Sequence, residues 1–373
     1  MEQLHWSDMY QSKNDLINDK QLVDIIRNIP PKLKLPDGIK LKIYNFPIQK
    51  MLSKEMMENI IIFNNTHNQV GIYNKTLIDE EYLIKIMNNM TCFALLFDNG
   101  KIIGMMISIA FRTIYLDNKP MYTSYTTNLC IHEDYRNKGL AISLIGGIIK
   151  SGSNERKVYH GYYLSEESHQ KINTMKIESW YRPINYIYLN EAGYQTIKNI
   201  SKKVNQKIFY HVKNLSSSVD DNPLKSPSIE NWEKALEFFK NDSIYMNPTF
   251  EEFKSICNLF NVHLFSNGII FLISFNVNVT KTNKVVKNAY LAYISGFQMN
   301  PQTESVGNLF EKALYIAKNT KNDLLSGFYH GYITEDVVTE NKGHTTISAL
   351  NLELYNSPNN INITDKNFHL PIF

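Results

Sequence analysis

The residues best suited to chemistry lie in one short basic loop. Arg136 and Lys138 precede Gly139, and an apolar run with helical spacing extends over residues 138–150. The first N–H groups of a helix have no partner inside it, and the helix dipole favours an anion there. Gly139 lets a ligand approach the backbone, and the two cations add positive charge. These features suit a phosphate site. Taken alone, however, such a loop is more often an ordinary strand-to-helix connection with solvated side chains, and without further evidence we favour that interpretation.

Nearby side chains offer a nucleophile and a base, each with a simpler explanation. Cys130 could act as a nucleophile, but its apolar neighbours Leu129 and Ile131 favour a small buried strand residue. His132 and the acids at 133 and 134 could accept a proton, yet three polar residues after a strand usually mark a turn. No Ser-His-Asp arrangement is recognisable in the sequence.

The loop is positioned by a predicted strand over residues 122–131 and by the helix that follows. Ahead of this strand, Asp98-Asn99-Gly100 joins two apolar runs, and an Asn-Gly pair between such runs is a strong hairpin signal. The other elements predicted in this half are strands over 39–46, 91–97 and 102–109 and helices over 21–28, 48–64 and 78–87.

The succession of elements restarts after residues 214–228, which have the composition of a linker. The second half is predicted to contain helices over 232–239 and 306–317 and strands over 269–278, 289–294, 324–333 and 346–355. Because both halves contain helices followed by strand, strand, helix and strand, the sequence predicts a duplicated α/β unit.

The composition is that of a globular chain with room for two domains. Of its 373 residues 43% are hydrophobic, and Lys plus Arg (39) nearly balance Asp plus Glu (36). The balance disfavours a dedicated nucleic-acid-binding protein, and the apolar content excludes global disorder. Three widely spaced cysteines (Cys92, Cys130 and Cys257) fit neither a zinc site nor a disulfide framework. With no secretory signal and no apolar run of about 20 residues, we expect a cytoplasmic protein without stable membrane insertion.

The loop and its preceding strand together resemble a known signature. Residues 136–141, Arg-Asn-Lys-Gly-Leu-Ala, resemble the Arg-x-x-Gly-x-Gly/Ala motif of the GCN5-related N-acetyltransferase superfamily. The strand ending in Asn-Leu-Cys-Ile-His at 128–132 is of the kind that precedes this motif. The resemblance implies that the loop cradles the pyrophosphate of coenzyme A. A plain acetyltransferase fills one such lobe, which leaves the rest of the chain to be explained.

Over nearly its whole length the chain resembles the N-myristoyltransferases, a two-lobed family of this superfamily. The matching fragments follow one another in order over about 320 residues, and each has a counterpart in the family's motifs. They are Leu-Pro-Asp-Gly-Ile at 35–39 (Leu-Pro-x-Gly-Phe), 128–132 (Asn-Phe-Leu-Cys-Val-His), 136–141 (Arg-Ser-Lys-Arg-Leu-Ala), 180–185 (Trp-His-Arg-Ser-Leu-Asn), 288–293 (Ala-Ala-Tyr-Ser-Phe-Tyr) and 354–356 (Leu-Tyr-Asn).

This resemblance implies two fused acetyltransferase-like α/β lobes with pseudo-twofold symmetry, each with a mixed central sheet flanked by helices. Residues 1–212 would form the acyl-CoA-binding lobe, and residues 213–373 the lobe that forms the peptide site and supplies the chain terminus. The implied reaction moves a myristoyl group from myristoyl-CoA, without a metal ion, to the N-terminal glycine amine of protein substrates. The implied partners are therefore acyl-CoA and glycine-starting peptides, and not nucleic acid.

The resemblance also implies roles for particular residues. Backbone N–H groups of Asn128 and Leu129, at an expected bulge, would stabilise the oxyanion, and the carboxylate of Phe373 would be the base. The apolar end of the chain at 370–373 fits a tail that docks inside, and a packed terminal strand without chemistry is an equal alternative. Coenzyme binding is implied for His5, Trp6, Leu129, Cys130, Ile131, Arg136, Asn137, Lys138, Gly139, Leu140 and Ala141. Substrate binding is implied for Tyr159, His160, Trp180, Tyr181, Tyr290 and Tyr293.

The peptide side departs from the family more than the coenzyme side. Residues 64–71 carry no acid where the family has an acidic run, and residues 346–350 lack the family's Asp. His160 stands in place of a Thr. Two alternatives therefore stay open: a catalytically weak homologue that binds acyl-CoA, and an N-acetyltransferase that uses short acyl groups.

Overall fold

A computed structural model describes most of the chain. The described residues are 35–45, 52–68, 74–88, 90–115, 120–156, 158–165, 174–194, 223–240, 244–296, 304–355, 363–364 and 368–372. The predicted helix over 21–28, the predicted coenzyme contacts His5 and Trp6, most of the linker and Phe373 lie outside these residues.

The first half forms an antiparallel sheet that ends in a parallel pair. The strands follow the order β1 (Ile39–Asn45), β3 (Thr91–Asp98), β4 (Lys101–Tyr115) and β5 (Met121–Ile131), and β6 (Val158–Ser165) lies parallel to β5. The predicted β3–β4 hairpin is confirmed. Its turn residues Asn99 and Gly100 have φ values of 47° and 81°, the left-handed pair that a two-residue turn needs.

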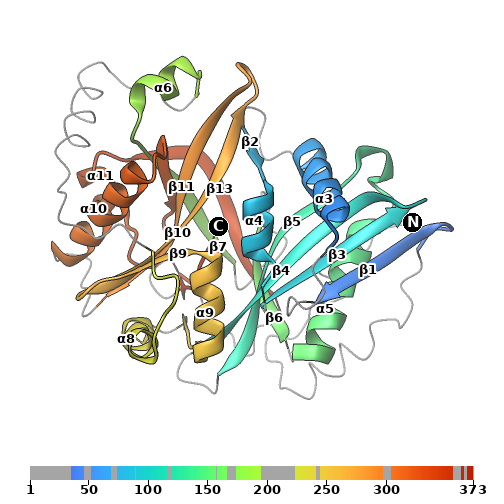
Figure 1. Ribbon diagram of the computed structural model, residues 1–373, viewed down its shortest axis with the longest axis horizontal. Helices are drawn as coiled ribbons and strands as arrows, with labels where there is room; N and C mark the ends of the chain where they lie inside the picture. Colours follow the sequence, from blue (N-terminus) through green and yellow to red (C-terminus); the bar gives the residue numbers. More distant parts are fainter. Residues whose placement is uncertain are drawn as a thin grey trace.

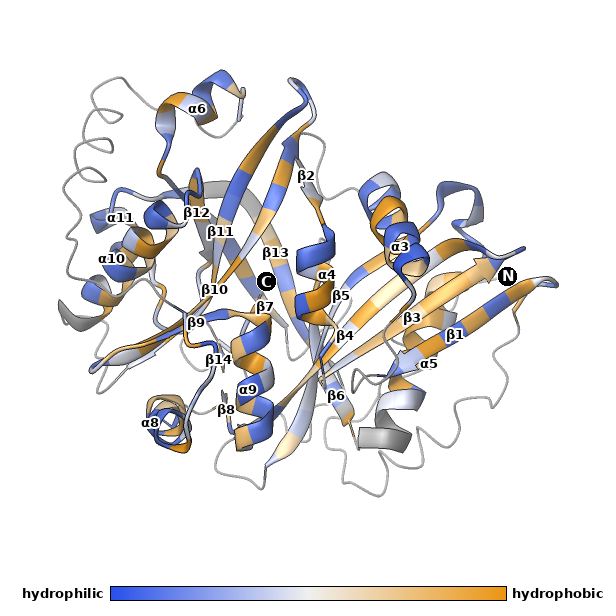
Figure 2. Ribbon diagram, viewed as in Figure 1, coloured by the Kyte–Doolittle hydropathy of each residue, from blue (hydrophilic) through white to orange (hydrophobic). Residues whose placement is uncertain are grey.

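Between β5 and β6 the chain forms the turn η1 (Glu133–Tyr135) and then helix α5 (Leu140–Arg156). Helix α5 packs on one face of the first-half sheet, and α3 (Lys54–His67) packs on the other (Figure 1). Successive β3 residues show this division, since Phe93 shares a cluster with Ile60 of α3 and Ala94 shares one with Leu144 of α5. Strands β3 and β4 are therefore apolar over most of their length (Figure 2).

The second half repeats this order of elements. Strands β10 (Gly268–Val279) and β11 (Lys284–Gly296) pair antiparallel, helix α10 (Glu304–Asn319) follows, and β12 (Leu324–Phe328) returns parallel to β11. This is the succession of β4, β5, α5 and β6, so the predicted mixed α/β fold with similar sheets in both halves is confirmed.

The two halves exchange their last strands. Strand β7 (Thr174–Pro183), from the first half, pairs with β12, while β13 (His344–Tyr355), from the second half, pairs with β6. Because β7 and β13 also pair with each other, one sheet runs through both lobes in the order β1-β3-β4-β5-β6-β13-β7-β12-β11-β10-β2.

Shorter elements complete the described structure. They are α4 (Glu80–Ile86), α6 (Tyr186–Glu191), α8 (Ile229–Phe239), α9 (Phe250–Leu259), α11 (Glu335–Glu340), β2 (Asn74–Leu77), β8 (Ile244–Met246), β9 (Asn261–Leu264) and β14 (Phe368–His369). Among the described residues no helix is both long and apolar enough to cross a membrane.

Several element bounds differ from the predicted ones, and two of these differences have a clear local cause. The helix predicted over 48–64 begins only at Lys54, because the Ser53 side chain accepts the N–H of Met56 and caps the helix there. The strand predicted over 324–333 ends at Phe328. The chain then turns through Gly331, whose φ of 58° is left-handed, and only an isolated bridge joins His330 to Ile333.

Candidate active site

A cavity of about 550 Å³ lies where β5 and β6 separate. The parallel pairing of these strands ends at Thr126 and Tyr163. Both strands line the cavity around that point, with residues 125–129 of β5 and residues 163–165 of β6. The volume is within the usual range of ligand pockets, roughly 300–1,000 Å³.

The cavity joins both lobes and its wall is mostly apolar. Helix α5 contributes Ile145, Ile148 and Ile149, and β4 contributes Met106. Further lining residues are Ile78 before α4, Tyr82 of α4 and, from the strands of the second half, Ile273, Phe275, Tyr290, Phe328 and Leu350. None of the described residues that line the cavity is Asp, Glu, Lys, Arg or His. A buried charge without a partner is costly, so this wall suits an uncharged chain.

The predicted bulge in β5 is confirmed at the cavity. Thr127 pairs with Ile107 and Cys130 with Met105, so Asn128 and Leu129 together oppose a single residue of β4. Asn128 has a φ of 54°, in the left-handed region that Asn adopts more readily than most residues. The bulge therefore takes the backbone of both residues out of the β4 ladder where they line the cavity.

A network of amide side chains links the bulge to the end of helix α3. Asn128 Nδ2 donates to Asn64 Oδ1 of α3 at 3.1 Å, and that oxygen also accepts from Asn68 Nδ2 at 3.1 Å. Asn65 in turn bonds the backbone of Ile78 in both directions, at 2.8 and 2.9 Å. The end of α3 is thus fixed to the cavity by neutral amides.

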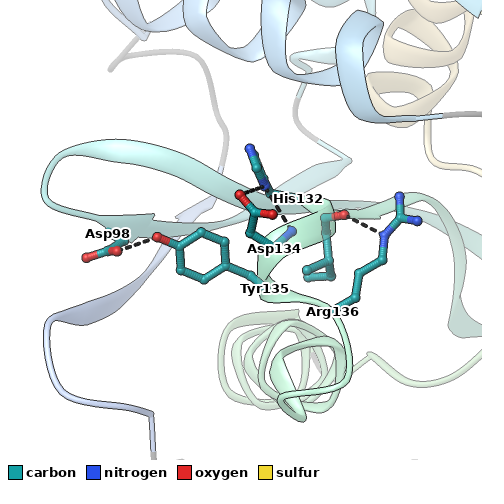
Figure 3. A network of polar contacts seen from close by, with 6 residues as sticks. Asp98, His132, Asp134, Tyr135 and Arg136 are labelled. Atoms are coloured by element: carbon teal, nitrogen blue, oxygen red, sulfur yellow. Dashed lines mark hydrogen bonds and ion pairs between the residues drawn. The ribbon is translucent and has the colours of Figure 1, made fainter.

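Side-chain contacts hold the basic loop between β5 and α5 (Figure 3). Tyr135 donates to Asp98 at 2.5 Å, and Lys138 Nζ lies 4.9 Å from the centre of the Tyr135 ring. Arg136 Nε donates to the carbonyl of Ile131 at 3.2 Å, and His132 Nδ1 accepts the N–H of Asp134 at 3.3 Å. These contacts fix the path of the chain between β5 and α5.

The loop has the backbone of an anion site. Asn137 and Gly139 have φ values of 60° and 72°, and α5 begins immediately afterwards at Leu140. Left-handed residues before a helix start turn successive N–H groups toward one side. Arg136, Lys138 and Gly139 are exposed, and beyond Gly139 and its two chain neighbours no heavy atom lies within 4 Å of where a Cβ on Gly139 would stand. There is room here for a phosphate group.

Several predicted site residues instead belong to the protein core. Trp180 is fully buried against Phe310 of α10, and Tyr181 packs 5.5 Å from the His344 ring. Tyr293 packs against Phe239 and Phe271. The cavity lining does not include these three aromatic residues.

Of the remaining predicted site residues, Tyr290 lines the cavity, and its buried hydroxyl has no hydrogen-bond partner among the described residues. Burial and the neighbouring Tyr125 raise the pKa of Tyr290 well above its usual value, so the hydroxyl is a donor at neutral pH. Cys130 and Leu140 are buried, and Ile131 and Ala141 are half-buried. Tyr159 is in β6, and its side chain lies outside the described residues.

His160 of β6 is buried, and burial lowers its pKa to about 4. Because this lies below the ordinary value of 6.5, its contribution to stability is complete above pH 6.5 and declines as the pH falls toward 4. We expect unfolding to become easier over that range, by at most about 3 kcal/mol for this residue. Urea titrations at pH 8, 6 and 5 should give a weaker pH dependence for His160→Gln than for the wild type. Equal slopes would contradict the assignment.

The described tail enters the molecule between the two lobes. β14 pairs with β8, Tyr162 of β6 donates to the carbonyl of Pro371 at 2.7 Å, and the Ile372 N–H donates to Ala292 of β11 at 3.3 Å. Leu370 and Ile372 are fully buried. Residues 368–372 are therefore buried inside the molecule, which fits both a tail that docks inside and a packed terminal strand, since β14 pairs with β8 of the second half.

Sequence reasoning missed the residues of α5 and β6 that line the cavity. The isoleucines at 145, 148 and 149 follow the i, i+3, i+4 spacing of a buried helix face, which is also what an ordinary core helix shows. Tyr163 and Ser165 had no signal at all, because their role depends on where two parallel strands stop pairing.

Comparison with known proteins identifies the fold. No family model matches the sequence, and no curated protein sequence matches it. Two structures of Saccharomyces cerevisiae N-myristoyltransferase with bound myristoyl-CoA match with TM-scores of 0.68 and 0.69 at 15% identity. They cover 89% and 92% of this chain, which spans 86% and 87% of theirs. A third, with myristoyl-CoA and inhibitors, has a TM-score of 0.67 at 16% identity, covering 92% of this chain and 88% of its own.

The chain is thus of the mixed α/β class, with one sheet that runs through two halves of similar element order. Within that class it has the N-myristoyltransferase fold over about nine-tenths of its length. At 15–16% identity, this likeness establishes the shared fold.

Proposed function

We propose that this protein transfers a long saturated acyl group, in the first place myristoyl, from coenzyme A to the N-terminal glycine amine of protein substrates. The observation that carries the proposal is the uncharged cavity at the split between β5 and β6, bordered by the Asn128–Leu129 bulge. In this proposal residues 1–212 bind the acyl-CoA, and residues 213–373 complete the peptide site and deliver the chain end.

The acyl chain would lie against the apolar wall of the cavity. Each buried methylene contributes about 0.8 kcal/mol, so an apolar wall favours a long chain strongly over an acetyl group. Ile145, Ile148, Ile149 and Met106 supply that surface from α5 and β4. The wall supports the long-chain donor and disfavours the short-chain acetyltransferase.

The coenzyme would be held by the loop before α5. Its pyrophosphate would accept from backbone N–H groups near Gly139 and pair with Arg136 and Lys138. The Nε of Arg136 donates to the Ile131 carbonyl (Figure 3). This hydrogen bond orients the guanidinium and leaves its terminal nitrogens for a ligand.

Attack of the amine on the thioester carbonyl forms a C–N bond and a tetrahedral oxyanion. When this intermediate collapses, the C–S bond breaks and coenzyme A is released. The N–H groups of Asn128 and Leu129 would donate to that oxyanion, since the bulge removes both residues from pairing with β4. One such donor is worth about 3 kcal/mol of barrier in a measured protease.

The amine must be neutral to attack, and its proton needs an acceptor. We assign that role to the carboxylate of Phe373 in the 373-residue chain. The buried path of residues 368–372 between Tyr162 and Ala292 supports this assignment. Burial makes His160 a poor proton acceptor at neutral pH, because it lowers the pKa to about 4.

One observation favours a second candidate function, an acyl-CoA-binding protein with little turnover. The side of the cavity near the bulge, where the acceptor peptide would bind, is held by hydrogen bonds among the amides of Asn64, Asn68 and Asn128. No described lining residue is acidic. A cationic peptide would find no charged partner in this wall.

Binding of a series of acyl-CoAs tests the long-chain site. Affinity should rise roughly fourfold per added methylene until the cavity is full, and then fall. Calorimetry with acetyl-, octanoyl-, dodecanoyl-, tetradecanoyl- and hexadecanoyl-CoA measures this directly. Tightest binding of acetyl-CoA would favour the short-chain alternative, and tight tetradecanoyl-CoA binding without transfer to any glycine peptide would favour the second candidate.

A further inference from the structure

The turn after β12 packs against the last described residues of the chain. Strand β12 ends at Phe328, which lines the cavity, and the chain turns through residues 329–333 before α11 begins. Residues 330–332 of this turn contact the tail, which here means residues 368–372. Leu370 and Ile372 of the tail are fully buried, so the turn meets the tail inside the molecule.

Gly331 lets the tail approach the turn closely. A Cβ on Gly331 would stand 2.8 Å from Nδ1 and 3.1 Å from Cε1 of the His369 ring, too close for either to stay in place. His369 is itself buried, and its ring packs against the Tyr332 ring with 4.6 Å between their centres. Any side chain at position 331 would therefore have to displace His369. Gly331 also has a left-handed φ of 58°, which glycine adopts freely.

His330 links the same turn to β11 and to the tail. The ring is buried, and its Nδ1 lies 3.1 Å from the Phe328 carbonyl oxygen. Burial lowers the pKa of His330 to about 4, while hydrogen bonds to the backbone of Phe328, Ala292 and Leu370 act in the opposite direction. The Ala292 carbonyl also accepts the N–H of Ile372 at 3.3 Å. The turn, β11 and the tail are therefore joined at one place.

We propose that residues 330–332 form a seat that positions the tail for acyl transfer. This inference rests on the proposed function, in which the carboxylate of Phe373 accepts the proton of the amine. None of the three residues is among the described residues that line the cavity, so they act through the tail as positioning residues. A base works only within hydrogen-bond reach of the proton that it accepts, so a tail displaced by about 1 Å should support transfer poorly.

Gly331→Ala tests the seat, because the added methyl group meets the His369 ring. We expect the single-turnover rate of acyl transfer to fall about 10- to 100-fold, the effect of misplacing a catalytic group by about 1 Å. The Kd of myristoyl-CoA should stay within about twofold of the wild-type value, because the loop before α5 is unchanged. The N–H of Ile372 should exchange with solvent about tenfold faster, since its hydrogen bond to Ala292 would open more often.

The matched control separates the contact with the tail from backbone strain. Gly100 has a φ of 81°, so Gly100→Ala strains the β3–β4 turn in the same way. Beyond Gly100 and its two chain neighbours, however, no heavy atom lies within 4 Å of the added methyl group. Gly100→Ala should therefore change neither the transfer rate nor the exchange of Ile372.

Two further variants test the contact itself. His369→Ala removes the ring that the methyl group meets, so adding Gly331→Ala in that background should lower the rate by no more than about twofold. If Gly331→Ala does not fold, Tyr332→Ala removes the ring that packs on His369, and should likewise speed the exchange of Ile372 and slow transfer.

The outcomes separate this inference from the proposed function. Exchange of Ile372 that is no faster in Gly331→Ala than in Gly100→Ala would overturn the seat, whatever the activity. Faster exchange with an unchanged transfer rate would overturn its positioning role. A wild-type protein that transfers no acyl group would overturn the proposed function, and with it the role in transfer, while the exchange rates would still decide whether residues 330–332 hold the tail.

Discussion

Adding a short extension after Phe373 of the 373-residue chain should lower the rate of acyl transfer by a factor of roughly 10²–10⁴, the usual contribution of a positioned base. Residues 370–372 are buried, with the Ile372 N–H bonded to Ala292 and the Pro371 carbonyl to Tyr162. In the proposed function, an extension would move the terminal carboxylate away from the amine and leave these contacts in place. Single-turnover kinetics with a glycine-starting peptide measures the effect.

The controls for the tail separate the charge from the packing. Phe373→Leu keeps the carboxylate and should cost far less than the extension. The extended protein should still bind acyl-CoA, because the loop before α5 and the β5–β6 split are unchanged. Normal turnover by the extended protein would exclude the carboxylate as the base.

Replacing Arg136 by Ala together with Gly139 by Asp should weaken acyl-CoA binding by roughly 10²-fold or more. Each lost charge-assisted contact costs about 1.5–3 kcal/mol, and a new carboxylate repels phosphate. The loop is exposed and braced from Tyr135 and Asp98, so the variant should keep the stability of the wild type to within about 2 kcal/mol. Calorimetry with myristoyl-CoA gives the affinity, and thermal unfolding checks the fold.

A matched variant separates backbone conformation from charge in this loop. Gly139 has a φ of 72°, which Asn tolerates better than most residues, so Gly139→Asn keeps the turn without adding charge. It should lose much less affinity than Gly139→Asp. Unchanged affinity in the Arg136→Ala, Gly139→Asp protein would show that the loop is only a connection.

The sequence predicted those parts of the fold that depend on local signals. The Asn99-Gly100 turn, the strand before the basic loop and helix α5 all follow from turn chemistry and apolar spacing. The bulge at Asn128 was predicted from the family resemblance, and its left-handed φ is compatible with the Asn at that position.

The sequence could not predict features that depend on pairing between distant strands. The exchange of β7 and β13 between the lobes leaves no local pattern, because either strand would be equally apolar in its own half. The cavity lies where β5 and β6 stop pairing at Thr126 and Tyr163, and the position of that split depends on the register of two distant strands. Trp180 and Tyr293 match family motifs, yet the structure uses them to fill the core.

The most direct test of acyl transfer is the mass of a glycine-starting peptide after incubation with the protein and myristoyl-CoA. The proposed function predicts one added tetradecanoyl group on the N-terminal amine, and none on the same peptide with an acetylated N terminus. A panel of glycine-starting peptides that includes neutral and basic sequences, all left unmodified while the protein binds myristoyl-CoA, would contradict it.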